Sequence, residues 1–409
     1  MRSYTESHPF ISFSVDTRQI PPPLWILLGE AKSKCEHLRG VPLPLSTQRE
    51  LQKVYLAKGV LATTAIEGNT LSEKEVRKIL EGTLKLPPSK AYLKTEIDNI
   101  IGVCNRIWED DAGQDFLSPT LIKEFNAAIL KGLHLDEGVI PGEIRTRSFG
   151  VPGYRGAPAE DCEYLLGRLC EWLLEIKPEK EMVIIQAILN AVIAHLYLAW
   201  IHPFGDGNGR TARLMEFFLL VQAGVPMAAA HLLSNHYNLT RSEYYRQLSQ
   251  ASKSGGDVVP FLNYAVRGLV DGLKDQLKLV RQTQLGLAWG DYVRERFVGL
   301  TSRAAARRQL LVHALSEGDW EERAGLTRLN ADVAAAYATK TGKTLTRDIN
   351  ALVKMGLIRI DGTRVKARRY LMLAFRSKSK DPRVQDEIRE ALVERPRKGR
   401  PKSGGGQRN

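Results

Sequence analysis

The sequence predicts a mainly helical protein with more than one domain. Apolar residues recur at helical spacing from Ser118 to about Gln276, and residues 182–201 are apolar almost throughout. After Thr301 the sequence pattern is different. Three short segments with helical spacing are followed by the signal of a β-hairpin. With 409 residues, the chain is long enough for two or three domains that each bury a core.

Residues 1–115 are expected to form a helical N-terminal region. Residues 10–15 have a strand-like pattern, and helices are expected over 23–38 and 92–111. Between them, residues 46–82 have helical spacing that is interrupted at Glu67-Gly68-Asn69-Thr70, where Gly and Asn are typical of a helix end. Ser72 and Glu75 have the spacing of a capping box, so a helix restarts there.

Residues 116–276 are expected to form the central domain. The expected helices cover 159–176, 182–200, 210–223, 241–252 and, with a break, 258–299. Residues 145–158 are rich in Gly, Pro and aromatic side chains and predict a hairpin or loop. The apolar run at 182–201 contains Gln186, Asn190 and His195, which favour a buried core helix over a membrane span.

The remaining residues are expected to form a connecting helix (277–300), a winged helix-turn-helix (301–375) and a basic tail that is disordered (376–409). Asp361-Gly362 between two β-like segments indicates a tight hairpin after the three helices. The side chains expected on the exposed face of the third helix and on the wing are basic or polar: Thr346, Arg347, Asn350, Lys354, Arg364, Lys366, Arg368 and Arg369.

The charge of +13 favours a polyanionic partner, because much of the excess lies near the C-terminus. Residues 397–402 resemble an AT-hook, whose Gly-Arg-Pro fits a narrow minor groove. DNA is therefore a candidate partner of residues 301–409. Packing or protein binding by the same module stays open.

The four cysteines have no metal-type or framework spacing. Cys162 and Cys170 lie inside an apolar helical pattern, which predicts buried free thiols and fits a reducing cytosol. The N-terminus lacks the apolar core of a signal peptide. We therefore expect a cytoplasmic protein without a membrane span.

Residues 202–213, HPFGDGNGRTAR, carry the most informative chemistry. Gly207 and Gly209 allow backbone N–H groups to turn toward one anion, at the positive N-terminus of the following helix. Arg210 and Arg213 are three residues apart, so both can meet a phosphate from one helix face.

Two further side chains in this segment suit phosphate chemistry. Asp206 supplies a hard oxygen ligand for a Mg²⁺ that keeps water and phosphate ligands. His202 can accept a proton near neutral pH. Together with the glycines and arginines, these residues predict a site for nucleotide phosphates.

The segment matches the Fic-family motif HPFx(D/E)GNGRxxR at every defined position, so residues 118–276 resemble a Fic domain. The resemblance implies a helical fold in which residues 145–158 form a β-hairpin flap. It also implies transfer of AMP from ATP, assisted by Mg²⁺, to a hydroxyl group of a protein. UTP or GTP stays open as the donor.

The resemblance assigns roles to single residues. His202 would deprotonate the target hydroxyl, which attacks the α-phosphate, and Asp206 would hold Mg²⁺. Phe204 would anchor the loop. The nucleotide-binding residues would be Gly207, Asn208, Gly209, Arg210, Arg213, Tyr244 beside the adenine, and Gly150 and Val151 of the flap.

Residues 63–68, TTAIEG, resemble the inhibitory motif (S/T)xxxE(G/N) of Fic proteins. In that interpretation Thr63 helps to place the helix, Gly68 ends it, and Glu67 pairs with Arg213 and blocks productive ATP binding. The alternative is a glutamate that merely ends a helix. In some relatives this glutamate serves removal of AMP, so a reverse activity stays open.

Two functions from different classes remain. The first is an autoinhibited protein adenylyltransferase that modifies an unnamed protein or itself. The second is a DNA-binding regulator that uses the Fic core as a nucleotide sensor, although a sensor has no need of His202. A second copy of the chain is a further candidate partner.

Overall fold

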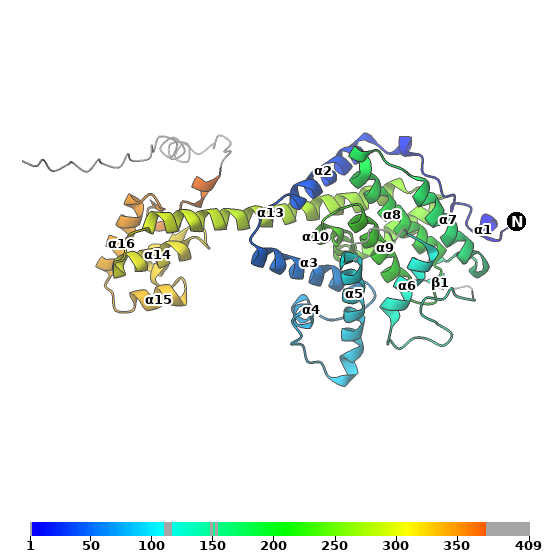
Figure 1. Cartoon of the computed structure of the whole chain (residues 1–409), viewed down its shortest axis with the longest axis horizontal. Helices are drawn as coiled ribbons and strands as arrows, with labels where there is room; N and C mark the ends of the chain where they lie inside the picture. Colours follow the sequence, from blue (N-terminus) through cyan, green and yellow to red (C-terminus); the bar gives the residue numbers. More distant parts are fainter. Residues whose placement is uncertain (1, 110–116, 148–149, 152–153, 374–409) are drawn as a thin grey trace, which may run out of the picture. The chain divides into compact units, whose positions relative to one another are not determined.

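The computed structural model describes residues 2–109, 117–147, 150–151 and 154–373. The chain divides into two compact units, Met1–Lys278 and Leu279–Asn409 (Figure 1). Helices dominate both units, so the predicted mainly helical class is confirmed. The predicted basic tail at 376–409 and its AT-hook-like segment lie outside the described residues.

The first unit is a cluster of helices around α8 (Figure 1). They are α1 (Tyr4–Ser7), α2 (Pro22–Arg39), α3 (Leu45–Ala65), α4 (Glu73–Leu80), α5 (Ala91–Glu109), α6 (Pro119–Leu130), α7 (Cys162–Glu175), α8 (Val183–Ile201), α9 (Asn208–Gln222), α10 (Met227–Ala230), α11 (Leu232–Leu239), α12 (Arg241–Lys253) and the first part of α13 (Val259–Phe297), which continues into the second unit. The flap strands β1 (Gly150–Val151) and β2 (Tyr154–Arg155) pair antiparallel, as the predicted hairpin requires.

Helix α8 forms the centre of this unit and packs along α9, α7 and α2. The helix Lys180–Ile201 is long and apolar enough to cross a membrane, but 72% of its most apolar window is buried inside the protein. It is therefore the buried core helix that the sequence predicts. Cys162 and Cys170 are buried free thiols, also as predicted.

Two predictions about the first unit are wrong. Residues 10–15 form no strand, because Phe13 adopts φ 50° and the segment pairs with no other strand among the described residues. Helix α13 has no break. Its Gly268 and Gly272 instead allow α11 to pack closely against it. A Cβ added to Gly268 would lie 2.0 Å from the His236 ring, and one added to Gly272 would lie 2.9 Å from Leu232.

The turn between α3 and α4 follows the sequence prediction closely. Gly68 has φ 105°, which a residue with a side chain rarely adopts. The Ser72 hydroxyl accepts from the backbone N–H of Glu75, and the Glu75 carboxylate accepts from the backbone N–H of Ser72. The predicted capping box is confirmed, and it fixes where the chain re-enters a helix after Glu67.

The second unit combines three helices and a small sheet. Its elements after α13 are α14 (Arg303–Leu315), β3 (Glu321–Glu322), α15 (Ala331–Tyr337), α16 (Gly342–Lys354), β4 (Ile358–Asp361) and β5 (Arg364–Ala367). Strand β5 lies between β3 and β4. The β4–β5 hairpin turns at Gly362-Thr363, one residue later than expected. Strand β3 was missed because Glu321-Glu322 carries no apolar alternation.

Candidate active site

The motif segment connects α8 to α9 and is held by its own side chains. The Asn208 side chain accepts from the backbone N–H of Phe204 at 2.9 Å and donates to the Phe204 carbonyl at 2.8 Å. Phe204 itself is 1% exposed and anchors the loop in the core. The loop therefore presents its glycines in one fixed conformation.

His202 caps α8 in a left-handed conformation, with φ 50° and ψ 58°. Arg145 holds this turn, because its Nε donates to the His202 carbonyl at 2.7 Å. Burial and the charge of Arg145 together lower the pKa of His202 to about 4. The imidazole is therefore neutral at physiological pH, which is the form that accepts a proton.

Glu67 lies over the glycines of the motif. A Cβ added to Gly209 would lie 2.4 Å from Glu67 Oε1, so only glycine leaves room for the carboxylate. Glu67 Oε1 accepts from Arg213 Nη2 at 2.5 Å. Although burial alone would raise it, the pKa of Glu67 is lowered by the Arg213 guanidinium, so the pair is ionised at neutral pH.

Arg213 is buried and bonded to the C-terminal end of α3 and the residues that follow it. Its Nε donates to the Thr63 hydroxyl at 2.8 Å, and its Nη2 also donates to the Thr63 carbonyl at 3.0 Å. Thr63 and Glu67 are one helical turn apart, so one segment supplies all of these acceptors. The structure thus brings together the three residues that the sequence grouped by resemblance.

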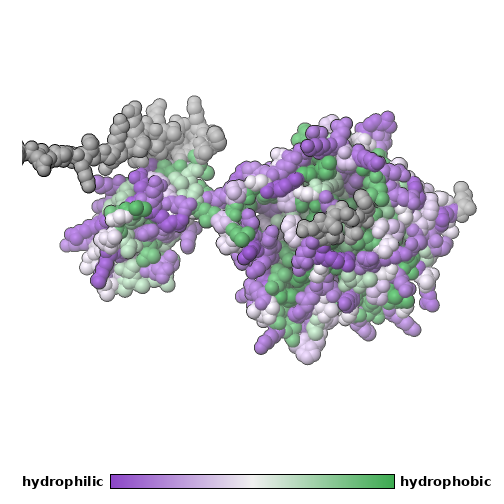
Figure 2. All heavy atoms as spheres, viewed as in Figure 1, coloured by the Kyte–Doolittle hydropathy of each residue, from purple (hydrophilic) through white to green (hydrophobic). Residues whose placement is uncertain are grey.

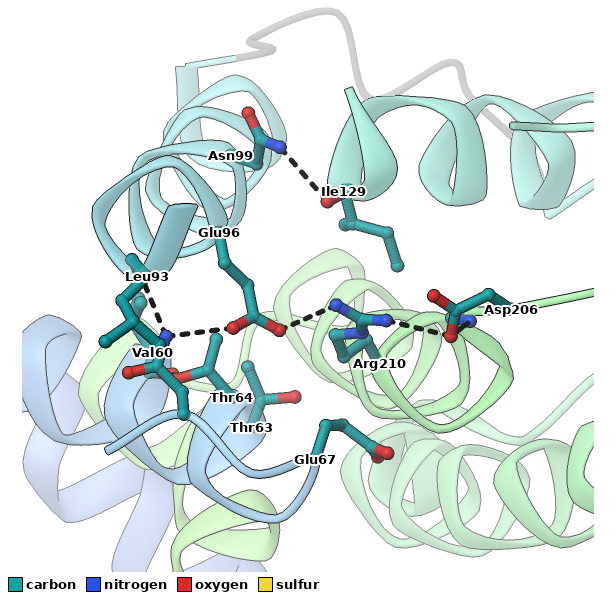
Figure 3. A network of polar contacts seen from close by, with 12 residues as sticks. Val60, Thr63, Thr64, Glu67, Leu93, Glu96, Asn99, Ile129, Asp206 and Arg210 are labelled. Carbon is teal, nitrogen blue, oxygen red and sulfur yellow. Dashed lines mark hydrogen bonds and ion pairs between the residues drawn. The ribbon is translucent and has the colours of Figure 1, made fainter. Parts of the chain in front are cut away.

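Arg210 faces a different set of acceptors (Figure 3). Its Nη1 donates to Glu96 Oε1 at 2.6 Å, and its Nη2 donates to Asp206 Oδ1 at 3.0 Å. The Asp206 side chain is 47% exposed, whereas the Arg210 side chain is 9% exposed. Sequence reasoning missed Glu96, which lies 114 residues before Arg210 in an ordinary helical pattern.

A pocket of about 570 Å³ opens beside these groups. Its lining includes Glu67, His202, Gly209, Arg213, Tyr244 and Tyr245. At its far end the Tyr244 hydroxyl lies 2.8 Å from His195 Nε2, and His195 Nδ1 lies 3.0 Å from the buried Glu216 carboxylate. His195 is buried, and it lines the pocket.

The flap borders the same pocket through Tyr154, whose hydroxyl donates to the Trp200 carbonyl at 2.7 Å. Gly156 lies against the motif segment, since an added Cβ would lie 2.8 Å from His202 Cβ. Gly150 and Val151 form β1, and their backbone is all that the structure describes of them.

The Fic/DOC family model matches residues 116–220, which include the whole motif segment. Those residues are similar to a Fic domain. The match extends beyond the motif to the helices that hold it, because α6 to α9 lie almost entirely inside the matched range.

Known proteins extend this similarity beyond the Fic domain. Protein adenylyltransferase Fic of Nematostella vectensis is 29% identical over 253 residues, which cover 59% of this chain and 53% of that protein. Protein adenylyltransferase fic-1 of Caenorhabditis briggsae is 32% identical over 229 residues, covering 54% and 41%. The chain thus spans about half the length of the curated relatives it matches.

A solved structure supports the fold. A Fic family protein from Desulfovibrio desulfuricans aligns with a TM-score of 0.53 at 20% identity, covering 88% of this chain and 98% of that one. At this identity the similarity concerns the fold alone.

Proposed function

We propose that this chain transfers the AMP part of ATP to a hydroxyl side chain of a protein. The observation that carries the proposal is the convergence, in one pocket, of the neutral His202, Arg213 and the Asn208-Gly209 backbone. The names of the relatives support the same activity. Incubation of the Glu67→Gly protein with ATP labelled at the α-phosphate tests it, since label must then appear on protein.

Each residue of the site has a separate role in this proposed transfer. His202 takes the proton of the target hydroxyl as its oxygen attacks the α-phosphate, and pyrophosphate leaves. The backbone N–H groups at Gly207, Asn208 and Gly209 and the arginines bind the phosphate oxygens. Tyr244 borders the adenine end of the pocket. Each group acts by holding charge or a proton, so no covalent enzyme intermediate is required.

The residues present fit a magnesium ion. The described residues contain no cluster of three or more metal-binding side chains. The half-exposed Asp206 carboxylate nevertheless suits Mg²⁺, which commonly binds one carboxylate, water and substrate phosphates. When bound, the ion would neutralise phosphate charge. Asp206 is then the residue that holds it.

We further propose that Glu67 inhibits the transfer. Its carboxylate lies over Gly209 and pairs with Arg213, so it occupies both the space and the cation that a phosphate needs. Self-modification and removal of AMP are compatible with this site, as is a dimer of the chain. The buried thiols fit a reducing compartment, and we propose a cytoplasmic location.

The pH dependence of the transfer follows from the burial of His202. The pKa of His202 in the free enzyme is about 4, so its neutral form, which acts as the base, persists down to that pH and is lost below it. The acid limb of kcat/KM, which reports the free enzyme, is therefore expected near pH 4 in the Glu67→Gly protein. A limb near pH 6.5 would contradict the buried, neutral histidine.

The second unit favours a further function, binding of DNA. The 28 basic and 14 acidic residues of 279–409 give it a net charge of +14, whereas 1–278 has a net charge of −1. The face of this unit seen in Figure 2 is largely hydrophilic. We propose that α16 contacts DNA as the recognition helix of a winged helix-turn-helix.

The cations of α16 are better placed for phosphates than those of the wing. Arg347, Asn350 and Lys354 are exposed. Neither Arg347 nor Lys354 forms an ion pair with a carboxylate of the described residues, since Asp348 pairs with Arg307 and Arg308. On the wing, in contrast, Lys366 pairs with Asp319, and Arg364 lies 3.7 Å from Asp361. The helix therefore supplies the phosphate contacts in this proposal.

Binding of the full chain to duplex DNA of random sequence tests this second function. Affinity should fall steeply with salt, and Arg347→Gln with Lys354→Gln should reduce the slope of log K against log salt by about 2. Arg49→Gln with Lys53→Gln on α3 removes the same charge as a control. Deleting residues 395–409 should weaken binding and flatten the slope as well. Absence of DNA binding at low salt would refute the proposal.

A further inference from the structure

Glu96 connects the site to the turn that carries Glu67. It lies on α5, is 8% exposed and uses both oxygens. Oε1 accepts from Arg210 Nη1 at 2.6 Å, and Oε2 accepts from the Asn69 side-chain amide at 2.8 Å. Figure 3 shows Glu96 reaching toward Arg210, with Asp206 on the other side of the guanidinium.

Asn69 in turn fixes the backbone that follows Glu67. Its amide also donates to the Leu93 carbonyl at 3.1 Å, and its oxygen accepts from the backbone N–H of Leu71 at 3.0 Å. Asn69 itself is 7% exposed. The turn that carries Glu67 is therefore anchored to α5 by buried hydrogen bonds.

Only a carboxylate at position 96 can accept a hydrogen bond from both Arg210 and Asn69. Arg210 and Asn69 each point a hydrogen-bond donor at it, so both of its oxygens must accept. A glutamine presents one oxygen and one NH₂ group, and in either orientation its NH₂ faces a donor. A shorter side chain would fail to reach both partners.

From this arrangement, and resting on the transfer activity proposed above, we propose that Glu96 is a positioning residue. It holds the Arg210 guanidinium in place and ties it to the turn that carries Glu67. Without Glu96, the remaining carboxylate partner of Arg210 among the described residues is Asp206. The guanidinium already donates to Asp206 Oδ1, and without Glu96 it would be free to move further onto this carboxylate, which serves the metal ion.

Glu96→Gln in the Glu67→Gly background tests the first half of the proposal. We expect kcat to fall about tenfold or more, because a misplaced arginine misaligns the phosphates. The Mg²⁺ concentration for half-maximal transfer should rise severalfold, which a merely less stable protein would not show. The matched control is Asp98→Asn on the same helix, whose carboxylate forms an exposed pair with Lys94.

A binding measurement separates this proposal from the transfer activity itself. Calorimetry should show that Mg²⁺ strengthens ATP binding less in Glu96→Gln than in Asp98→Asn, whether or not label is transferred. If Glu67→Gly transfers no label, the proposed function fails while this comparison still stands. Equal effects of Mg²⁺ in the two variants would overturn the positioning role.

Asn69→Ala in the otherwise unchanged chain tests the second half. The substitution leaves Glu67, Arg213 and Arg210 intact but frees the turn from α5. Basal self-modification should rise above that of the unchanged chain and stay below that of Glu67→Gly. Unchanged self-modification would show that the turn is held without Glu96, and it would overturn the link between the two.

Discussion

Replacing Glu67 by glycine is expected to raise self-modification by well over about tenfold. The carboxylate is tethered beside Arg213, so it competes at high effective concentration with a diffusing nucleotide. Arg213 has one planar guanidinium group, which can bind either Glu67 or a phosphate with good geometry but not both at once. Removing the carboxylate also clears the space above Gly209, where Glu67 Oε1 now lies. Label from ATP on the protein itself measures the gain.

The chain offers a matched control for this prediction. Glu81 caps α4 and is likewise followed by a glycine with positive φ, but it forms no ion pair with any described residue. Glu81→Gly should therefore leave self-modification unchanged. Glu67→Gly combined with Arg213→Ala should lose the gain, because the released arginine is its proposed cause. If Glu67→Gly is no more active than the unchanged chain, Glu67 is only a helix-end residue.

Replacing His202 by alanine in the Glu67→Gly protein is expected to reduce transfer by about 100-fold or more. That is the scale on which a general base contributes. ATP binding should persist, because the glycine backbone, Asp206 and both arginines remain. Transfer is measured with labelled ATP, and binding by calorimetry.

The exposed His134 supplies the control for this second prediction, and His134→Ala should transfer AMP normally. Near-normal transfer by the His202→Ala form would remove the histidine from the mechanism. Loss of ATP binding together with transfer would instead show that the side chain supports the pocket.

The parts of the site that were predictable from sequence are those encoded locally. The segment 202–213 carries the proposed base, the proposed metal ligand, the glycines and the arginines within twelve residues, and the capping box at Ser72 is a four-residue pattern. Thr63 and Glu67 lie about 150 residues from Arg213, and only a resemblance to known proteins connected them. Nothing in their own spacing indicates which arginine they meet.

The residues that were missed act on the site from elements that are distant in the sequence. Glu96 and Arg145 lie in segments with no motif, and they meet Arg210 and the His202 carbonyl across 114 and 57 residues. The two errors of fold have a similar cause. The break expected within 258–299 is absent from α13, whose Gly268 and Gly272 instead pack against α11. The strand expected at residues 10–15 has no partner strand among the described residues.

The left-handed conformation of His202 has a consequence for how this protein can evolve. A residue with a side chain costs about 1 kcal/mol or more in that region, whereas glycine adopts it freely and commonly ends helices in this way. Selection for thermal stability alone would favour glycine at position 202 and abolish the base. A protein that keeps histidine at position 202 is therefore less stable than the glycine variant would be, and in exchange it keeps the proposed base. In laboratory evolution, a drift toward glycine at this position would mark a population in which the activity is no longer under selection.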